Sequence, residues 1–139
     1  MSVEKIKAFQ IDVTEIATVP ALNDVDASAK IYDVAGGISG LPVGNTTVSS
    51  FVIVRDVSFP SNLSGSVSKA QIASTGMSVF SIEKNGTQFA TLTFNSSAVG
   101  IFNGAATTFT SGDILSVVTP PLQDTTLSDV YYTLSGMII

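Results

Sequence analysis

The sequence predicts an all-β protein: an antiparallel β-sandwich, jelly-roll-like, with an N-terminal arm. Short runs rich in β-branched and aromatic residues are separated by turn residues at intervals of roughly 8–12 positions. No stretch has the apolar spacing of an amphipathic helix of useful length. The segment SIEKNGTQFATLTF, residues 81–94, sets Asn85-Gly86 between two such runs, and this dipeptide is the strongest short-range signal for a β-hairpin.

The first third of the chain is the least regular. Residues 1–49 are expected to form an arm and loops, and residues 50–139 the sandwich body. Within the arm, Phe9, Ile11 and Val13 alternate with polar residues, which is the period of a strand. Two interpretations stay open for this segment: an arm that packs on a neighbour, or the first strands of the same domain.

The remaining elements follow from local pattern. A short strand is expected at residues 29–34, and AGGISG (residues 35–40) is interpreted as a flexible loop. The segment FVIVRDVSF (residues 51–59) is nearly continuous in apolar residues at first, which predicts one strand buried on both faces. Residues 61–75 have no strong period and predict a loop or a bent strand. Later strands are expected at residues 99–102, near 107–109, at 114–118 and at 129–139.

The register of the hairpin is argued from its apolar face. A two-residue loop would pair Ile82 with Phe89. A three-residue loop with Gly86 in the left-handed conformation pairs Phe80 with Ala90 instead. Only the second register gathers one cleanly apolar face, so we predict the three-residue loop Lys84-Asn85-Gly86. The face it creates contains Phe80, Ile82, Ala90, Leu92 and Phe94.

Composition excludes several classes of function. Charged residues make up 12% of the chain, about half the usual share, and the net charge is −5. The Lys and Arg residues are scattered, whereas nucleic-acid binding requires clustered cations, so no nucleic-acid partner is expected. No run approaches the roughly 18 apolar residues that span a bilayer, and the first residues lack the apolar core of a signal peptide. No membrane partner is therefore expected.

The chain has no His and no Cys, which removes the commonest general base, the commonest metal ligand and every disulfide. We therefore expect no enzyme, no cofactor and no catalytic residues. Asp113, Asp124 and Asp129 follow turns and could supply a carboxylate pair for glycoside hydrolysis, but such residues more commonly hold backbone N–H groups. The segment NDVD (residues 23–26) offers oxygen ligands of the kind Ca²⁺ takes, without the Gly and Glu of an EF-hand loop, and whether it binds Ca²⁺ stays open.

The C-terminal strand carries the candidate interface. Successive residues of a strand point to opposite faces, so only one of Tyr131 and Tyr132 can face the core. Aromatic residues are enriched at interfaces, and we predict subunit contacts for the tyrosines together with the apolar end, Met137, Ile138 and Ile139. Ordinary packing and a ligand platform are the alternatives for the tyrosines.

Several short motifs follow one another in a fixed order between residues 63 and 136. They are VFSI before KNG, TLTF, a Phe before Gly-Asp, a Leu before Pro, and a closing TLSG. In this order they resemble a β-rich module of tailed-bacteriophage virion structural proteins. The chain departs from that pattern at Ala90, where the family has glycine. The resemblance implies a module that builds virions, in decoration, fibre or receptor-binding proteins, often as a homotrimer, with no catalytic residues.

The resemblance leads to two expectations of function. The first is a trimeric head decoration (cement) protein of the virion, made in the host bacterial cytoplasm, whose tyrosines and C-terminal residues form trimer contacts. Its arm residues would contact the major capsid protein or a neighbouring subunit. The alternative is a tail or head fibre, a receptor-binding protein that recognises host-surface glycan. The short chain, which has neither a long shaft nor a coiled-coil heptad, favours decoration.

Overall fold

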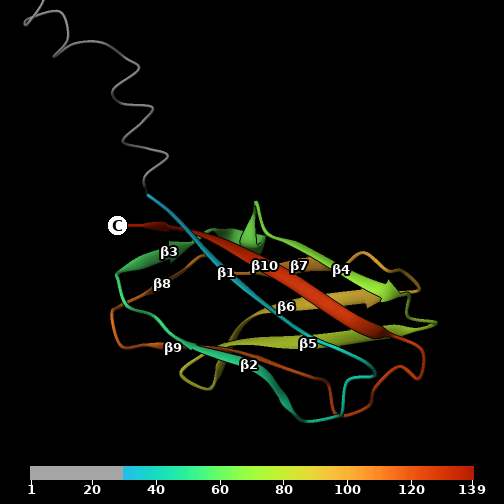
Figure 1. Ribbon diagram of the computed structural model, residues 1–139. Helices are drawn as coiled ribbons and strands as arrows, with labels where there is room; N and C mark the ends of the chain where they lie inside the picture. The colour runs from blue at the N-terminus through green and yellow to red at the C-terminus, as the bar shows by residue number, and fades with distance from the viewer. Residues whose placement is uncertain (1–29) are drawn as a thin grey trace, which may run out of the picture. The chain divides into compact units, whose positions relative to one another are not determined.

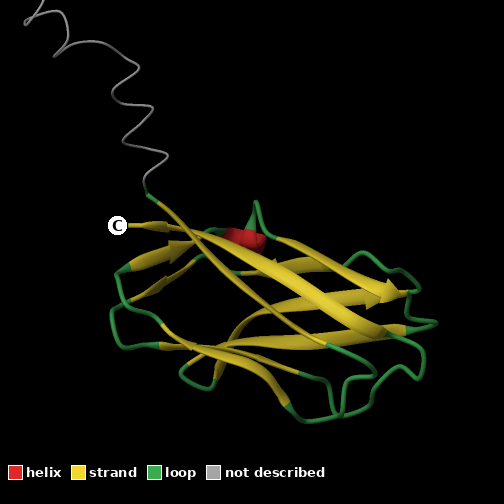
Figure 2. Ribbon diagram, in the orientation of Figure 1, coloured by secondary structure: helices red, strands yellow, loops and turns green. Residues whose placement is uncertain are grey.

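The computed structural model describes residues 30–139, and residues 32–139 form one compact unit. The predicted arm contacts Phe9, Ile11 and Val13 lie outside the described residues, as does the NDVD segment. Within the described part, ten strands and one short 3-10 turn, η1 (Ser61–Leu63), make up the regular structure. Figure 2 shows strands joined by loops in this part of the chain.

The strands form two antiparallel sheets, so the predicted all-β sandwich is confirmed (Figure 1). The first sheet contains β1 (Ile31–Ile38), β10 (Ser128–Ile138), β3 (Val57–Phe59) and β8 (Thr107–Phe109) in spatial order, and β4 (Val67–Ile72) also pairs with β10. The second sheet contains, in spatial order, β2 (Thr47–Val52), β9 (Ile114–Val118), β5 (Met77–Lys84), β6 (Thr87–Asn95) and β7 (Ile101–Gly104).

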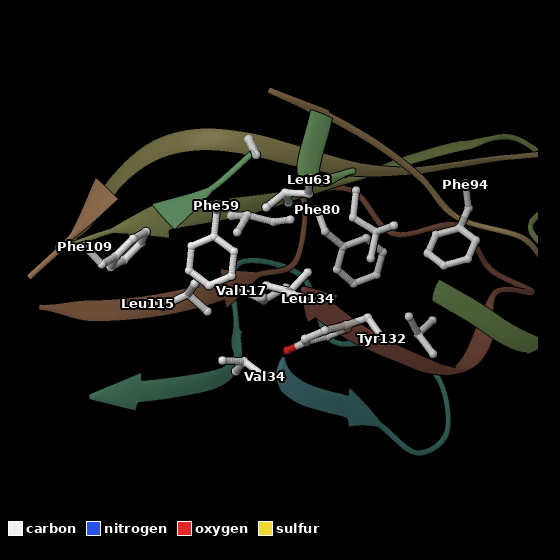
Figure 3. Packing of buried hydrophobic residues seen from close by; sticks show 14 of the residues in the cluster. Val34, Phe59, Leu63, Phe80, Phe94, Phe109, Leu115, Val117, Tyr132 and Leu134 are labelled. Atoms are coloured by element: carbon white, nitrogen blue, oxygen red, sulfur yellow. The ribbon is translucent and has the colours of Figure 1, made fainter. Parts of the chain in front are cut away.

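The core lies between the two sheets and is dominated by phenylalanine (Figure 3). Phe59 and Phe109 meet edge to face at 5.4 Å between ring centroids, and Phe80 and Phe94 do so at 6.0 Å. Phe89 of the second sheet meets Phe109 of the first at 5.5 Å, so one aromatic contact joins the layers. Edge-to-face pairs contribute about 0.5–1.5 kcal/mol beyond the apolar area that they bury.

The prediction of a single strand over residues 51–59 is wrong. β2 ends at Val52 in the second sheet, and β3 begins at Val57 in the first. The crossing is fixed by Ile53, which is fully buried and whose backbone N–H donates to the Asp113 carbonyl at 2.8 Å. Val52 and Val54 are 62% and 65% exposed, so the run is not buried on both faces. The apolar run is therefore divided between two strands, and the chain crosses from one sheet to the other between them.

β4 pairs with the segment of the chain that precedes β7. β4 occupies part of the segment predicted as loop or bent strand. Its Ala70 N–H donates to the Ala98 carbonyl at 2.8 Å, and Gly100 N–H donates to the Ser68 carbonyl at 3.2 Å. The chain therefore pairs with β4 before it enters β7 in the second sheet, which starts at Ile101.

The interpretation of AGGISG as a flexible loop is wrong for its first four residues, which form the end of β1. β1 and β2 both begin before residue 50, so the sheets include residues that the sequence assigns to the arm and loops. The two glycines have a packing role beside β10. A Cβ at Gly36 would lie 2.5 Å from the Tyr132 hydroxyl oxygen, and one at Gly37 would lie 2.5 Å from Cδ1 of Tyr131.

The hairpin has the predicted apolar face but not the predicted loop. All five predicted residues of that face are buried, at 2% exposure or less. Lys84 pairs with Thr87, so the turn has two residues, Asn85 and Gly86, with φ of 50° and 81°. The predicted pairing of Phe80 with Ala90 is therefore wrong: Phe80 pairs with Leu92 and Ile82 with Ala90, because Phe89 is an extra residue in a bulge on β6. The bulge shifts the facing of the later β6 residues by one position. The hairpin can therefore have both a two-residue turn and an apolar face.

Candidate interaction surface

The outer side of the first sheet carries a shallow, mainly apolar hollow that crosses β10. We call its outward-facing side chains the β10 surface: Ala35, Val67, Lys69, Val99, Tyr131 and Thr133. β1 lies along one edge of β10 and β4 along the other, as Figure 1 shows. Three adjacent segments of the sheet therefore contribute to one face.

Alternation along β10 determines which side chains reach this face. Val130, Tyr132 and Leu134 are buried, whereas Tyr131 is 43% exposed. The prediction that only one of the two tyrosines faces the core is confirmed. The same alternation leaves Met137, near the end of the strand, 50% exposed.

Tyr131 stands at the centre of the β10 surface, between β1 and β4. It pairs across the strands with Lys69, and Gly37 leaves room beside its ring. Its hydroxyl lies 3.4 Å from Oγ of Ser39, just beyond β1. A second hollow, lined partly by Gln71, also includes Tyr131 and Lys69. These two side chains therefore stand between two neighbouring hollows.

The β10 surface is almost uncharged. Val67 and Val99 are 68% and 58% exposed, which is unusual for aliphatic side chains so close together. Within residues 30–139 the ion pair found joins Lys84 to Asp113, so Lys69 has no acidic partner there. Asp33 is exposed on β1, two residues before Ala35 and therefore on the same face. One cation and one anion thus lie on opposite sides of β10.

Tyr132, which the sequence predicts as a trimer contact, belongs to the core of its own chain. It is only 4% exposed, and Figure 3 shows its ring among the buried residues near Val34. Its hydroxyl forms a hydrogen bond with Oγ of Ser49 in β2, so the side chain spans from the first sheet to the second. Burial raises the pKa of Tyr132 above its ordinary value. Almost none of its side chain is therefore accessible to a neighbouring subunit.

The other predicted trimer contacts lie near the end of β10. Met137 pairs with Ser58 and Ile138 with Val57, and the Ile139 N–H donates to the Asp56 carbonyl at 3.0 Å. Ile139 is 67% exposed, and Ile138 is half-buried. Their subunit contacts stay predictions, and the exposed ones, Met137 and Ile139, share the outer face with Tyr131.

Asp124 holds backbone groups, as the favoured interpretation predicts. Its Oδ2 accepts from the N–H groups of Thr75 and Gly76, at 3.0 and 2.9 Å. Its Oδ1 accepts from the hydroxyl and N–H of Thr126 and from the N–H of Leu127. These bonds, the Thr126 hydroxyl foremost, hold the pKa of Asp124 well below its ordinary value. The side chain ties the loop before β10 to the loop before β5.

Asp113 has a comparable structural role. It accepts hydrogen bonds from the Asn85 side chain and from the N–H of Thr110, and it pairs with Lys84 at 3.1 Å. The Asn85 bond, then that of Thr110, then Lys84 hold its pKa well below the ordinary value. In residues 30–139 no group of three or more His, Cys, Asp or Glu is arranged to hold a metal ion.

Several residues of the β10 surface are missed by sequence reasoning. Val67 and Lys69 face outward because Ser68 and Ala70 take the inner positions of β4. An apolar residue that alternates with serine predicts the opposite facing, since the apolar member is expected in the core. A usable signal was the pair of glycines, Gly36-Gly37, in a chain that also contains two adjacent tyrosines.

Comparison with known proteins does not assign the chain to a family. The chain matches no family model and no curated protein. Across residues 30–139 the structure contains no helix that is both long and apolar enough to cross a membrane.

Proposed function

We propose that this protein is a structural component of a tailed-bacteriophage virion, a head decoration (cement) protein that assembles as a homotrimer on the outer capsid. The observation that carries the proposal is the β10 surface, where exposed Val67, Val99 and Tyr131 lie together on one face of the first sheet. Exposed apolar side chains gathered in this way mark protein interfaces. The resemblance of residues 63–136 to virion modules supports the same proposal.

The arrangement of charge favours a ring of subunits. Lys69 on β4 and Asp33 on β1 flank β10 from opposite sides. In a cyclic trimer each contact joins two different patches, one from each neighbour. Lys69 of one subunit can then face Asp33 of the next, while Tyr131 and Val67 are covered. Met137 and Ile139 extend the same face toward the C-terminus.

Decoration would work by mass action. A protein that binds only the assembled shell stabilises it by RT ln(1 + [L]/Kd), about 2.7 kcal/mol per site at 100 times Kd. We propose that Phe9, Ile11 and Val13 contact the major capsid protein or a neighbouring subunit, because their alternation suits a strand with one apolar face. This mechanism requires neither catalysis nor a cofactor.

The alternative is a fibre or receptor-binding protein that recognises host-surface glycan. The arrangement of Tyr131, Lys69 and Gln71 favours it, since an exposed ring beside two hollows and polar groups is suited to a sugar. Binding of the purified protein to a glycan array, abolished in Tyr131→Ala, would support this function. Intact binding in that variant would exclude the β10 surface as the glycan site.

The copy number of the protein in purified particles distinguishes the two functions. Quantitative mass spectrometry against the major capsid protein gives that ratio directly. We expect about one trimer per symmetry-related capsid position, and particles that lack the protein should lose their DNA at lower temperature. A few copies per particle would overturn decoration and favour the fibre.

A further inference from the structure

The side chain of Asn85 in the hairpin turn is hydrogen-bonded to residues at the start of β9. Nδ2 of Asn85 donates to Oδ1 of Asp113 at 2.8 Å, and Oδ1 of Asn85 accepts from the Ile114 N–H at 2.8 Å. The backbone N–H of Asn85 also donates to the Ile114 carbonyl at 2.8 Å. Together with Lys84, which pairs with Asp113, we call these residues the turn clamp.

The carboxylate of Asp113 accepts hydrogen bonds from several donors around it. Thr110 donates its N–H to Oδ2 at 2.8 Å, Lys84 pairs with the same oxygen, and Asn85 serves Oδ1. The carboxyl is ionised at neutral pH, and these donors lower its pKa further. A carboxylate has only acceptor capacity, so each neighbour must bring a proton.

Asn85 is followed by Gly86, and this order makes the amide chemically labile. The backbone nitrogen of Gly86 can attack Cγ of Asn85, because glycine has no Cβ to block the approach. A new N–Cγ bond forms, the Cγ–Nδ2 bond breaks, and ammonia leaves with the proton of the attacking nitrogen. One water then opens the cyclic imide and gives aspartate or its isomer linked through the side chain. No oxidant or reductant is needed.

The turn gives water free access to this chemistry. Asn85 and Gly86 are both exposed, and no heavy atom lies within 4 Å of a Cβ built at Gly86. The turn clamp opposes the reaction, because Nδ2 and Oδ1 of Asn85 are both hydrogen-bonded, to Asp113 and Ile114. To present Cγ to the Gly86 nitrogen, the side chain must release Asp113 and Ile114.

We propose that Asn85 is a site of slow, spontaneous deamidation which the turn clamp restrains, and that the product opens the clamp irreversibly. In the product a carboxylate oxygen replaces Nδ2, so two anions meet where a donor and an acceptor met before. Like charges at that separation oppose each other strongly. The modified chain therefore loses the contact that had protected it.

Opening of the clamp would loosen both sheets at that end of the sandwich. Nζ of Lys84 also donates to the Thr108 carbonyl at 2.7 Å and lies 5.3 Å from the ring centre of Phe109. Phe109 is fully buried and contacts phenylalanines of both sheets. Displacement of Lys84 would weaken β8 in the first sheet as well as the start of β9 in the second.

The first test compares rates of deamidation. The folded protein and the protein unfolded in urea are incubated at the same mildly alkaline pH, and peptide mass spectrometry measures conversion at Asn85. We expect folded protein to react at least several-fold more slowly, and Asp113→Ala to react faster than folded wild type. Equal rates in all three samples would overturn the restraint.

The second test isolates the meeting of two carboxylates. Asn85→Asp should lower the melting temperature by several degrees, and Asn85→Asp with Asp113→Asn should regain part of the loss, since donor and acceptor only exchange places. Asn95→Asp, an exposed change at the end of β6, is the control for added charge. A melting temperature of Asn85→Asp equal to that of Asn95→Asp would refute the effect on the clamp, as would a double variant that regains nothing.

Discussion

Gly36 in β1 makes room for the end of the Tyr132 side chain. A Cβ at residue 36 would lie 2.5 Å from the tyrosine hydroxyl oxygen and 2.8 Å from Cζ, closer than real carbon atoms approach. The absence of a side chain on one strand thus allows a tyrosine of the next strand to cross the core and reach Ser49 in the opposite sheet. The two sheets are joined by a polar contact that depends on a glycine.

Gly36→Ala should therefore destabilise the protein. The added methyl group forces Tyr132 to move, and overpacking of this kind costs about 1–3 kcal/mol. Unfolding in urea, followed by circular dichroism, measures the change. Combining Gly36→Ala with Tyr132→Phe should cost less than the sum of the two single changes, because the hydroxyl is the nearest obstacle. Strict additivity would contradict the proposed contact.

Tyr132→Phe removes the hydrogen bond between the sheets and should cost about 1 kcal/mol. It should also change stability at high pH. Burial raises the pKa of Tyr132 in the folded state, so above about pH 10 the unfolded chain loses its proton first and gains stability relative to the folded chain. Wild type should therefore lose stability more steeply than Tyr132→Phe as pH rises through this range. Parallel pH profiles from urea unfolding would refute the assignment.

The last strand shows how far the sequence predicts the structure. The strand predicted at residues 129–139 is β10, displaced by one residue at each end, and the opposite facing of Tyr131 and Tyr132 follows from period-two alternation. The buried face of the hairpin follows from the same rule. The candidate surface was predicted only in part, because it draws on Val67 and Val99, whose positions depend on which strands become neighbours.

Two features could not be predicted because they concern how strands meet. The bulge at Phe89 adds a residue on one strand only, and alternation within a strand is blind to its partner's register. The crossing at Ile53 divides one apolar run between two sheets, and nothing local distinguishes a long strand from two short strands that change layers. Both features depend on how the strands pack together in the core.

Asp124→Asn should weaken the link between the loops before β5 and β10 and flatten the loss of stability in acid. The pKa of Asp124 is held below its ordinary value, so its contribution is present above about pH 4 and is lost as pH falls through the ordinary value toward the native one. Thermal unfolding across this pH range should show a shallower slope in the variant than in wild type. An unchanged slope would assign the acid sensitivity to other carboxyls.

Ser78→Ala should leave stability unchanged or raise it. Oγ of Ser78 is buried and has no hydrogen-bond partner among residues 30–139, and an unsatisfied buried group costs about 1–3 kcal/mol. Ser74→Ala is the matched control, because Ser74 is also buried but exchanges hydrogen bonds with the backbone of Ser97. The control should lose stability in the same thermal unfolding experiment. Equal losses in both variants would indicate that Ser78 has a partner.

Reversal of charge tests the proposed ring of subunits. Lys69→Glu and Asp33→Lys should each weaken self-association, measured by sedimentation velocity, because each places like charges across the contact. The variant with both changes should recover association, since the pair is restored with its signs exchanged. Glu83→Lys, on β5 in the other sheet, is the control for altered net charge and should leave association unchanged. Single variants that sediment like wild type would place the subunit interface elsewhere, whereas weakened singles without recovery would mean that Lys69 and Asp33 lie in the interface but do not face each other.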